Sequence, residues 1–473
     1  MSAQSAIDPA PLVGRMRALL QGGRFGAARP VLSAVRRLLP LCCEVDELEA
    51  RLLLGEKRLP EALALLDRSL ERAPGAVALL LCRAEVRLGG NDAQAAARDA
   101  AEAVVLDAAN ARAKAVLGIV LSDLDQLDDA IICLAEAVRA EPDCSAFRLG
   151  LSTAQERAGD RVTAAATLRD GIARQPGDVA LRTAAVMTAM RRRDFAGAAM
   201  LAEAARREGV ADACVFGLLG HALSNLGRHE EATAAYCEAG RLAPEDPYVR
   251  HLVRAAGGLP SDRRAPAAYV ETLFDGYAER FEQHLIGLGY RVPGLMRAQL
   301  LGRGELGPVL DLGCGTGLIG VVLSDLACHP LVGVDLSGRM LAAAGEKQIY
   351  DELIQADIET VLGDPRRCWR TVLAADVLCY FGALEAVLGA VAARLEIGGR
   401  LLFSVEVLCD GDGASDWLLR GQGRYAHTRD YVERCLVGAG LRIGAIRAEV
   451  LRQEGGRDVD GLLIVAERVC DDG

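Results

Sequence analysis

The chain has 473 residues, which at roughly 100–200 residues per domain predicts two to four domains. Hydrophobic residues make up 51% and charged residues 25%, as is ordinary for a globular protein. The net charge of −11 disfavours binding to nucleic acid or to an anionic membrane, because an acidic surface repels phosphate groups.

None of the 14 cysteines forms a C-x-x-C pair, so the spacing expected of a zinc or dithiol site is missing and we predict no metal. Scattered cysteines of this kind are typical of buried positions in a reducing compartment. Residues 1–12 are expected to form a tail, since no basic segment leads into an apolar run there. No apolar stretch reaches about 18 residues, so we expect no membrane-spanning helix and a cytoplasmic location.

A repeat with a period of 34 residues runs through the first half of the chain. Prolines separated by 34 or 68 residues mark the ends of its units: Pro40, Pro74, Pro142, Pro176 and Pro244. An alanine precedes each of the seven unit ends by twelve residues: Ala28, Ala62, Ala96, Ala130, Ala164, Ala198 and Ala232. Small residues at fixed places let two antiparallel helices pack closely, and a proline stops the second helix of a unit.

This pattern resembles the tetratricopeptide repeat (TPR), which has the same period. Seven units and a closing helix at 246–256 make up a predicted array over residues 13–256. The resemblance implies an α-helical solenoid whose concave face binds a protein or peptide partner. A rigid spacer or an oligomerisation surface is the alternative.

A linker and a helical lid are predicted over residues 257–300. The segment 257–266 is rich in glycine, proline and charge, and its Arg263–Arg264 pair is expected to be solvated. Aromatic and apolar residues then recur at helical spacing: Phe274, Tyr277, Phe281, His284, Leu285 and Leu288. This spacing predicts a helix that packs on the next domain, closes over a ligand site, or does both.

A buried strand at 308–312 then leads into a glycine-rich turn and a helix. The turn alone also satisfies the dinucleotide pattern G-x-G-x-x-G. Asp311 favours a different cofactor, because an acid before the first glycine holds an ammonium group and would repel a pyrophosphate. A second predicted strand ends at Asp335, whose carboxylate suits two ribose hydroxyls. Strand patterns at 441–451 and 460–467 add an antiparallel hairpin to a parallel sheet.

With these features, residues 301–469 resemble a class I S-adenosylmethionine-dependent methyltransferase. The whole chain is similar to the bacterial predicted TPR-repeat methyltransferases. The resemblance implies an α/β Rossmann-like domain after the solenoid, with a seven-stranded, mostly parallel sheet. It also implies that S-adenosyl-L-methionine is the cofactor and S-adenosyl-L-homocysteine the product.

The resemblance assigns nine residues to the cofactor. They are Asp311, Gly313, Cys314, Gly315 and Gly317 around the methionyl end, Asp335 and Leu336 at the ribose, and Asp357 and Ile358 at the adenine. The N-cap of a helix explains Asp357 equally well.

Three residues are candidates for catalysis. Asp376 and Tyr380 follow the fourth predicted strand, where residues of this family face the sulfonium and the acceptor. Tyr380 is equally well explained as a packing aromatic. His427 lies in a predicted loop at the carboxyl edge of the sheet, where it would deprotonate or orient the acceptor. Its structural alternative is a loop shaped by Thr428 as cap of the next helix.

The sequence therefore predicts transfer of a methyl group to an unidentified small-molecule or protein acceptor, with the array as a protein-interaction module. The chain lacks the N/D-P-P-Y/F tetrapeptide after the fourth strand, which disfavours exocyclic and amide nitrogens as acceptors. A non-catalytic adaptor that keeps a cofactor-binding fold is the alternative function. A nicotinamide oxidoreductase is a third.

Overall fold

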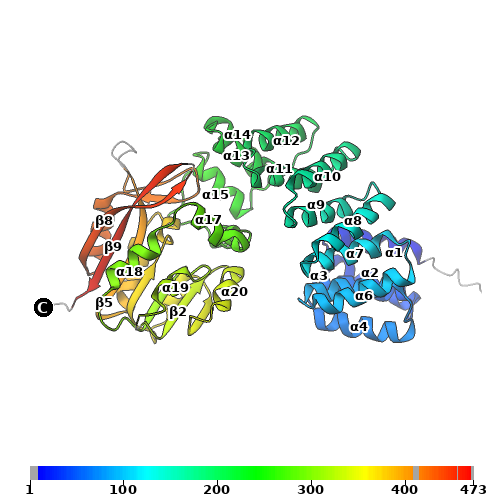
Figure 1. Ribbon diagram of the computed structural model, residues 1–473, viewed down its shortest axis with the longest axis horizontal. Helices are drawn as coiled ribbons and strands as arrows, with labels where there is room; N and C mark the ends of the chain where they lie inside the picture. Colours follow the sequence, from blue (N-terminus) through cyan, green and yellow to red (C-terminus); the bar gives the residue numbers. More distant parts are fainter. Residues whose placement is uncertain (1–8, 327, 409–414, 455, 470–473) are drawn as a thin grey trace, which may run out of the picture. The chain divides into compact units, whose positions relative to one another are not determined.

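The computed structural model describes residues 9–326, 328–408, 415–454 and 456–469. They belong to two compact units, Met1–Ala211 and Asp212–Gly473 (Figure 1). In these ranges every helix is too short or too polar to cross a bilayer.

Antiparallel helix pairs make up the first unit. Its helices are α1 (Ala10–Gln21), α2 (Phe25–Leu38), α3 (Cys43–Gly55), α4 (Leu59–Arg72), α5 (Val77–Gly89), α6 (Ala93–Leu106), α7 (Ala111–Asp123), α8 (Leu127–Ala140), α9 (Ser145–Arg157), α10 (Arg161–Arg174), α11 (Val179–Arg191) and α12 (Phe195–Arg207). From α3 to α11, each odd-numbered helix begins 34 residues after the previous one, and the even-numbered helices keep the same interval. This register confirms the predicted repeat.

Close packing explains the small residues of the repeat. The six repeat alanines of the first unit are fully buried. At a second small position, a Cβ atom on Gly118 would lie 2.7 Å from Cγ of Leu134 and 3.0 Å from the carbonyl oxygen of Ala130. A larger side chain would force the paired helices α7 and α8 apart, so the spacing of small residues follows from their contact.

The second unit begins with a seventh helix pair and a closing helix. These are α13 (Ala213–Asn225), α14 (His229–Leu242) and α15 (Pro247–Ala255). The Asp246 carboxylate caps α15 by accepting hydrogen bonds from the backbone N–H groups of Tyr248 and Val249.

The linker after α15 is held against the next domain by Arg264, which corrects the expectation of a solvated side chain there, whereas the Arg263 side chain is 76% exposed. The Arg264 guanidinium lies 4.6 Å from the ring centroid of Phe381 and forms ion pairs with Asp357 and Glu359. The backbone N–H of Ala265 also donates to the carbonyl oxygen of Tyr380 at 2.8 Å.

The predicted lid is a series of short helices instead of one long helix. They are α16 (Ala267–Asp275), the 3₁₀ turn η1 (Ala278–Arg280), α17 (Phe281–Gly287) and α18 (Val292–Leu300). Gly276 ends α16. The chain then bends so that the rings of Phe274 and Phe281 meet edge to face, 6.1 Å apart.

A mixed sheet forms the centre of the second unit. Its strands are β1 (Val309–Leu312), β2 (Leu331–Asp335), β3 (Glu352–Gln355), β4 (Trp369–Ala374), β5 (Leu395–Val407), β6 (Trp417–Leu419), β7 (Tyr425–His427), β8 (Leu441–Glu454) and β9 (Arg457–Arg468). The connecting helices are α19 (Leu318–Leu323), α20 (Gly338–Glu346), α21 (Ile358–Leu362), the 3₁₀ turn η2 (Leu378–Tyr380), α22 (Glu385–Arg394) and α23 (Arg429–Gly438).

The strand order is β3-β2-β1-β4-β5-β7-β6, and β9 pairs with both β5 and β8. Strands β1 to β5 run parallel to one another, whereas β9 runs antiparallel to β5 and to β8. The predicted α/β fold with a terminal antiparallel hairpin is therefore confirmed. The short strands β6 and β7 extend the sheet beyond the seven predicted strands.

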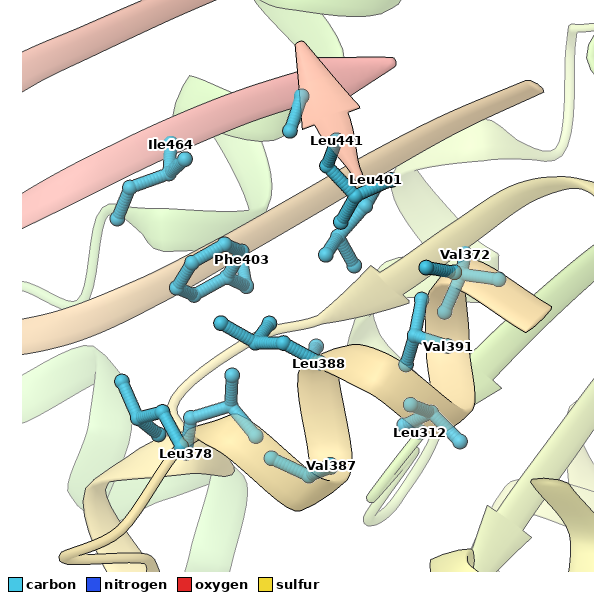
Figure 2. Close-up of a cluster of buried hydrophobic side chains, with 14 of the residues drawn as sticks. Leu312, Val372, Leu378, Val387, Leu388, Val391, Leu401, Phe403, Leu441 and Ile464 are labelled. Carbon is cyan, nitrogen blue, oxygen red and sulfur yellow. The ribbon is translucent and has the colours of Figure 1, made fainter. Parts of the chain in front are cut away.

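A hydrophobic core lies between the sheet and the helices that cover it. Figure 2 shows side chains of β1, β4, β5, β8 and β9 together with those of α22 and η2. The labelled residues are Leu312, Val372, Leu378, Val387, Leu388, Val391, Leu401, Phe403, Leu441 and Ile464. This core fixes the carboxyl ends of β1 and β4, where the predicted site residues lie.

Candidate functional site

A cavity of about 210 Å³ lies in the second unit, at the carboxyl ends of β1, β2 and β4. The lid covers it with Phe274, Tyr277, Phe281, His284 and Leu288. The opposite wall comes from the loops that follow the strands. Open parallel sheets bind ligands at this edge, so the cavity is the candidate site.

The glycine-rich turn lets the backbone form one wall. Gly313, Gly315 and Gly317 all have left-handed φ angles, of 62°, 55° and 88°. A Cβ atom on Gly313 would lie 2.4 Å from Cγ2 of Val377, so the approach of two loops requires glycine here. Gly313 and Gly315 line the cavity, whereas Gly317 caps α19 beside it.

Asp335 at the end of β2 both braces this turn and faces the cavity. Its Oδ2 accepts a hydrogen bond from the Gly315 N–H at 2.9 Å, and its Oδ1 accepts one from the Ser337 N–H at 2.8 Å. Burial raises the pKa of Asp335, and the two backbone donors oppose that rise. Leu336 lines the cavity next to it.

Asp311 and Cys314 lie behind the turn and do not line the cavity. Asp311 is buried and accepts a hydrogen bond of 2.6 Å from the Tyr350 hydroxyl. Burial raises the pKa of Asp311 to about 7, although the Tyr350 hydrogen bond lowers it. Cys314 Sγ packs against the backbone of Gly333, where a Cβ atom would lie only 2.9 Å from it.

At the far end of the cavity, Ile358 contributes an apolar side chain. Asp357 caps α21 by accepting a hydrogen bond from the Glu359 N–H at 3.0 Å, and it also pairs with Arg264. Asp357 is therefore the cap of α21; it does not itself line the cavity, whereas its ion-pair partner Arg264 and its neighbour Ile358 do.

Asp376 follows β4 in a left-handed conformation, with φ of 55°. Its Oδ1 accepts a hydrogen bond from Ser404 Oγ at 2.8 Å, and its Oδ2 pairs with Arg452 Nη1 at 2.6 Å. Burial raises the pKa of Asp376, and Arg452 opposes that rise. Tyr380 also lines the cavity, and its ring meets that of Phe274 edge to face at 5.7 Å. Both residues therefore border the cavity.

The structure does not bring His427 to the cavity. Its side chain is fully buried in β7, where Nε2 donates to the carbonyl oxygens of Phe381 at 2.8 Å and Gly382 at 3.1 Å. Burial lowers its pKa to about 4, so the ring is neutral at physiological pH. The next residue, Thr428, caps α23. This arrangement holds the loop after β4 in place and matches the structural alternative.

An ion cluster at one end of the cavity was not predicted. Arg424, Arg452 and Glu454 line the cavity, and both arginines pair with the buried Glu406. Arg452 and Glu454 are two residues apart on β8, so they share a face of the strand. That spacing of two charged residues in a predicted strand was the available signal.

The lid is tied both to the loop after β2 and, through Lys347, to the glycine-rich turn after β1. Asp275 accepts a hydrogen bond of 2.5 Å from Ser337 Oγ, next to Asp335. On the other side, Lys347 Nζ lies 2.7 Å from Glu282 Oε1 and donates to the Thr316 carbonyl oxygen at 2.7 Å. In the described ranges, no group of three or more histidine, cysteine or acidic side chains is arranged to hold a metal.

Comparisons with known proteins identify two kinds of domain in the chain. Residues 309–399 match a family model described as a methyltransferase domain. Residues 14–77 and 116–179 match one tetratricopeptide repeat model, and residues 215–246 match another. The chain therefore joins tetratricopeptide repeats to a methyltransferase domain.

Two curated relatives are similar to part of the chain. Malonyl-[acyl-carrier protein] O-methyltransferase of Enterobacter lignolyticus (strain SCF1) is 37% identical over 102 residues, which is 22% of this chain and 38% of the relative. Methyltransferase-like protein 27 of Homo sapiens is 34% identical over 120 residues, which is 24% of this chain and 46% of the relative. The chain thus spans less than half the length of either.

Solved structures resemble each part at low identity. Magnesium protoporphyrin IX methyltransferase from Synechocystis PCC 6803, with bound SAH, has a TM-score of 0.33 and 18% identity, covering 42% of this chain and 96% of that one. A tetratricopeptide repeat protein from Parabacteroides merdae ATCC 43184 has a TM-score of 0.37 and 17% identity, covering 53% and 98%.

Proposed function

We propose that the second unit binds S-adenosyl-L-methionine in this cavity and transfers its methyl group to a small-molecule or protein acceptor. The observation that carries the proposal is Asp335. Its carboxylate stands at the cavity wall, directly beside a glycine turn that only glycine can form. An acid and a backbone wall in this relation suit a nucleoside whose other end carries no phosphate.

The residues present fit the cofactor. Each Asp335 oxygen accepts one backbone hydrogen bond and so keeps a lone pair for a ribose hydroxyl. Leu336 and Ile358 supply apolar flanks for the adenine, with Asp357 close by. Gly313 and Gly315 would lie against the methionyl end. Asp311, Cys314 and Gly317 support that turn from behind, and Asp311 adds negative charge opposite an ammonium.

When bound, the cofactor supplies an activated methyl group on a positively charged sulfur. The protein then has to hold the acceptor in line with that methyl group and to exclude water. The aromatic lid excludes water, and its two ties, Asp275 to Ser337 and Glu282 to Lys347, hold it over the cavity. Asp376 and Tyr380 are our candidates for contact with the acceptor. We assign His427 the positioning of the loop that carries Tyr380.

The repeat array is proposed to bind a protein or peptide. Four charged residues on the first helices of three successive repeats, α3, α5 and α7, support this. Arg112 Nη1 lies 3.1 Å from Glu47 Oε1, its Nη2 lies 2.9 Å from Glu85 Oε1, and Arg51 also pairs with both glutamates. These groups present both charges on neighbouring helices, as suits a partner with polar side chains.

Isothermal titration of the full chain with S-adenosylmethionine and S-adenosylhomocysteine tests the cofactor. We expect both to bind the wild type and Asp325→Ala, whose carboxylate forms an exposed pair with Arg297. Asp335→Ala should weaken binding at least about 100-fold, because two hydrogen bonds to a charged group and the turn itself are lost. NADH should not bind. Binding of NADH alone would favour the oxidoreductase, and a folded protein that binds none of them would favour the adaptor.

A further inference from the structure

The cavity has a second end that the cofactor loops do not form. We call it the acceptor end; its members are Tyr290, Asp376, Tyr380, Arg424, Arg452 and Glu454. The cofactor-side residues follow β1, β2 and β3, whereas most of these residues follow β4, precede β7 or end β8. Because β4 and β7 lie on the other side of β1 in the strand order, the two ends belong to opposite halves of the sheet.

Arg452 has a partner for each part of its guanidinium. Its Nη1 lies 2.6 Å from Asp376 Oδ2, its Nε donates to Glu454 Oε1 at 2.8 Å, and its Nη2 pairs with Glu406. The side chain is only 5% exposed. Arg452 is therefore a structural cation, because its one positive charge is shared among three carboxylates.

Arg424 is paired only in part. Its Nε donates to Glu406 Oε1 at 2.7 Å, and its Nη2 donates to Glu454 Oε1 at 2.5 Å. Among the described residues, none accepts a hydrogen bond from its Nη1. A guanidinium stays charged at every physiological pH, so these N–H groups are permanent donors at the cavity wall.

Two phenol hydroxyls add to the donors at this end. Neither Tyr290 nor Tyr380 forms a side-chain hydrogen bond within the described residues, and burial raises the pKa of both well above its usual value. Both hydroxyls therefore keep their protons. Three donor groups here therefore lack an acceptor, whereas one oxygen, Glu454 Oε2, accepts no hydrogen bond from the described residues. Each Asp376 oxygen already accepts one hydrogen bond and keeps a second lone pair. The acceptor end is thus rich in donors.

We propose that the methyl acceptor is a small molecule with a carboxylate group, and that Arg424 recognises this group at the acceptor end. The carboxylate oxygens accept hydrogen bonds from Arg424 Nη1 and from the hydroxyls of Tyr290 and Tyr380. Its apolar body packs against Phe274, Leu285 and Leu288 of the lid side of the cavity. This inference rests on the proposed function, because it assigns the cofactor to the other end.

Matched probes of one shape test the charge preference. The full chain is first titrated with S-adenosylhomocysteine, and the saturated complex is then titrated with phenylacetate, phenylacetamide and phenethylamine. We expect phenylacetate to bind at least about tenfold more tightly than the amide, as the loss of one charge-assisted contact requires. The amine should not bind. Tighter binding of the amine, equal binding of all three probes, or binding of none overturns the inference.

Variants connect that preference to the named groups. Arg424→Gln combined with Glu454→Gln removes one charge of each sign, so the net charge around Glu406 does not change. This double variant should bind phenylacetate at least about tenfold more weakly than the wild type. Tyr380→Phe, which removes a single hydroxyl, should weaken phenylacetate binding by about fivefold. Arg434→Gln, at an exposed pair with Asp416, is the matched control and should change nothing.

Unchanged phenylacetate binding in both cavity variants would overturn the assignment. Binding of S-adenosylhomocysteine should stay within about twofold in all of them. The two proposals fail separately. If S-adenosylhomocysteine does not bind the wild type, the proposed function is wrong. If it binds and phenylacetate is not preferred, only the carboxylate inference is wrong.

Discussion

His251 donates a hydrogen bond of 2.9 Å from Nε2 to the carbonyl oxygen of Gly423. His251 lies on α15, the closing helix of the array, and Gly423 lies in the turn between β6 and β7. The turn packs closely on α16 and requires glycine, because Gly423 has a φ of 82° and a Cβ atom there would lie 2.5 Å from the Tyr269 hydroxyl. The residue after it is Arg424, so the closing helix holds the segment that carries a cavity arginine.

His251→Ala should therefore destabilise the second unit by about 1–3 kcal/mol, through a buried carbonyl without its donor and the loss of ring packing on Tyr269. The two tryptophans, Trp369 and Trp417, both lie in this unit, so their fluorescence during urea unfolding reports it alone. His229→Ala, at an exposed site on α14, serves as the control. Equal unfolding midpoints for the two variants would contradict the role given to His251.

The state of Asp311 should make cofactor binding depend on pH. Its pKa is raised to about 7, so its carboxylate is mostly protonated at pH 6 and mostly ionised at pH 8. If it attracts the ammonium group of the ligand, S-adenosylhomocysteine should bind about tenfold more tightly at pH 8 than at pH 6.

Two substitutions test that assignment. Tyr350→Phe removes the hydrogen bond that lowers the pKa of Asp311, so the midpoint of the pH profile should move upward. Asp311→Asn should give a profile that is flat between pH 6 and pH 8. A flat profile in the wild type would show that Asp311 does not sense the ligand.

His427 should contribute to acid sensitivity. Its pKa is about 4 in the folded state, below the roughly 6.5 of an unfolded chain, so the unfolded state binds more protons as pH falls from 6.5 towards 4. The contribution of the neutral His427 ring to the free energy of unfolding is therefore present above pH 6.5. About 2 kcal/mol of it should be lost as the pH falls from 7 to 5.

His427→Asn keeps one side-chain donor and removes the titration. The difference in unfolding free energy between pH 7 and pH 5 should therefore shrink by about 2 kcal/mol relative to the wild type. Tryptophan fluorescence in urea gives both values. If the two proteins lose the same free energy, His427 does not titrate as its surroundings indicate.

Alanine substitutions at two glycines of one helix should change the stability in opposite directions. A Cβ atom on Gly220 of α13 would lie 2.4 Å from the ring of Tyr236, whereas one on Gly217 would have no heavy atom within 4 Å. Gly220→Ala should cost about 1–3 kcal/mol of stability by overpacking. Gly217→Ala should gain about 0.5–1 kcal/mol, because alanine loses less backbone entropy in a helix. Thermal unfolding of the pair of variants checks both signs.

The features that could be predicted from the sequence are those that depend on local spacing. The 34-residue register of the repeat helices follows from the small residues that two helices need where they touch. The glycine turn and the strand that precedes it follow from residues 308–317 alone. In both cases the physical cause lies within a few turns of chain, so its signature is local.

The features that could not be predicted from the sequence depend on contacts between distant segments. Asp376 faces Arg452, which is 76 residues away, and no local pattern indicates that pairing. His427 could be placed near the sheet edge, but the direction of Nε2 depends on carbonyl groups 45 and 46 residues earlier. The lid bends at Gly276, where helical spacing predicted continuity, because the aromatic rings pack on one another across the bend.

The strand order divides the cavity between separate stretches of sequence. One end is encoded by residues 311–358, whereas Arg424, Arg452 and Glu454 come from the last fifty residues and Tyr290 from before the sheet. Substitutions in the last fifty residues can therefore exchange the charges of one end without touching the turn or Asp335. Evolution could change what such a domain accepts while conserving how it holds its cofactor.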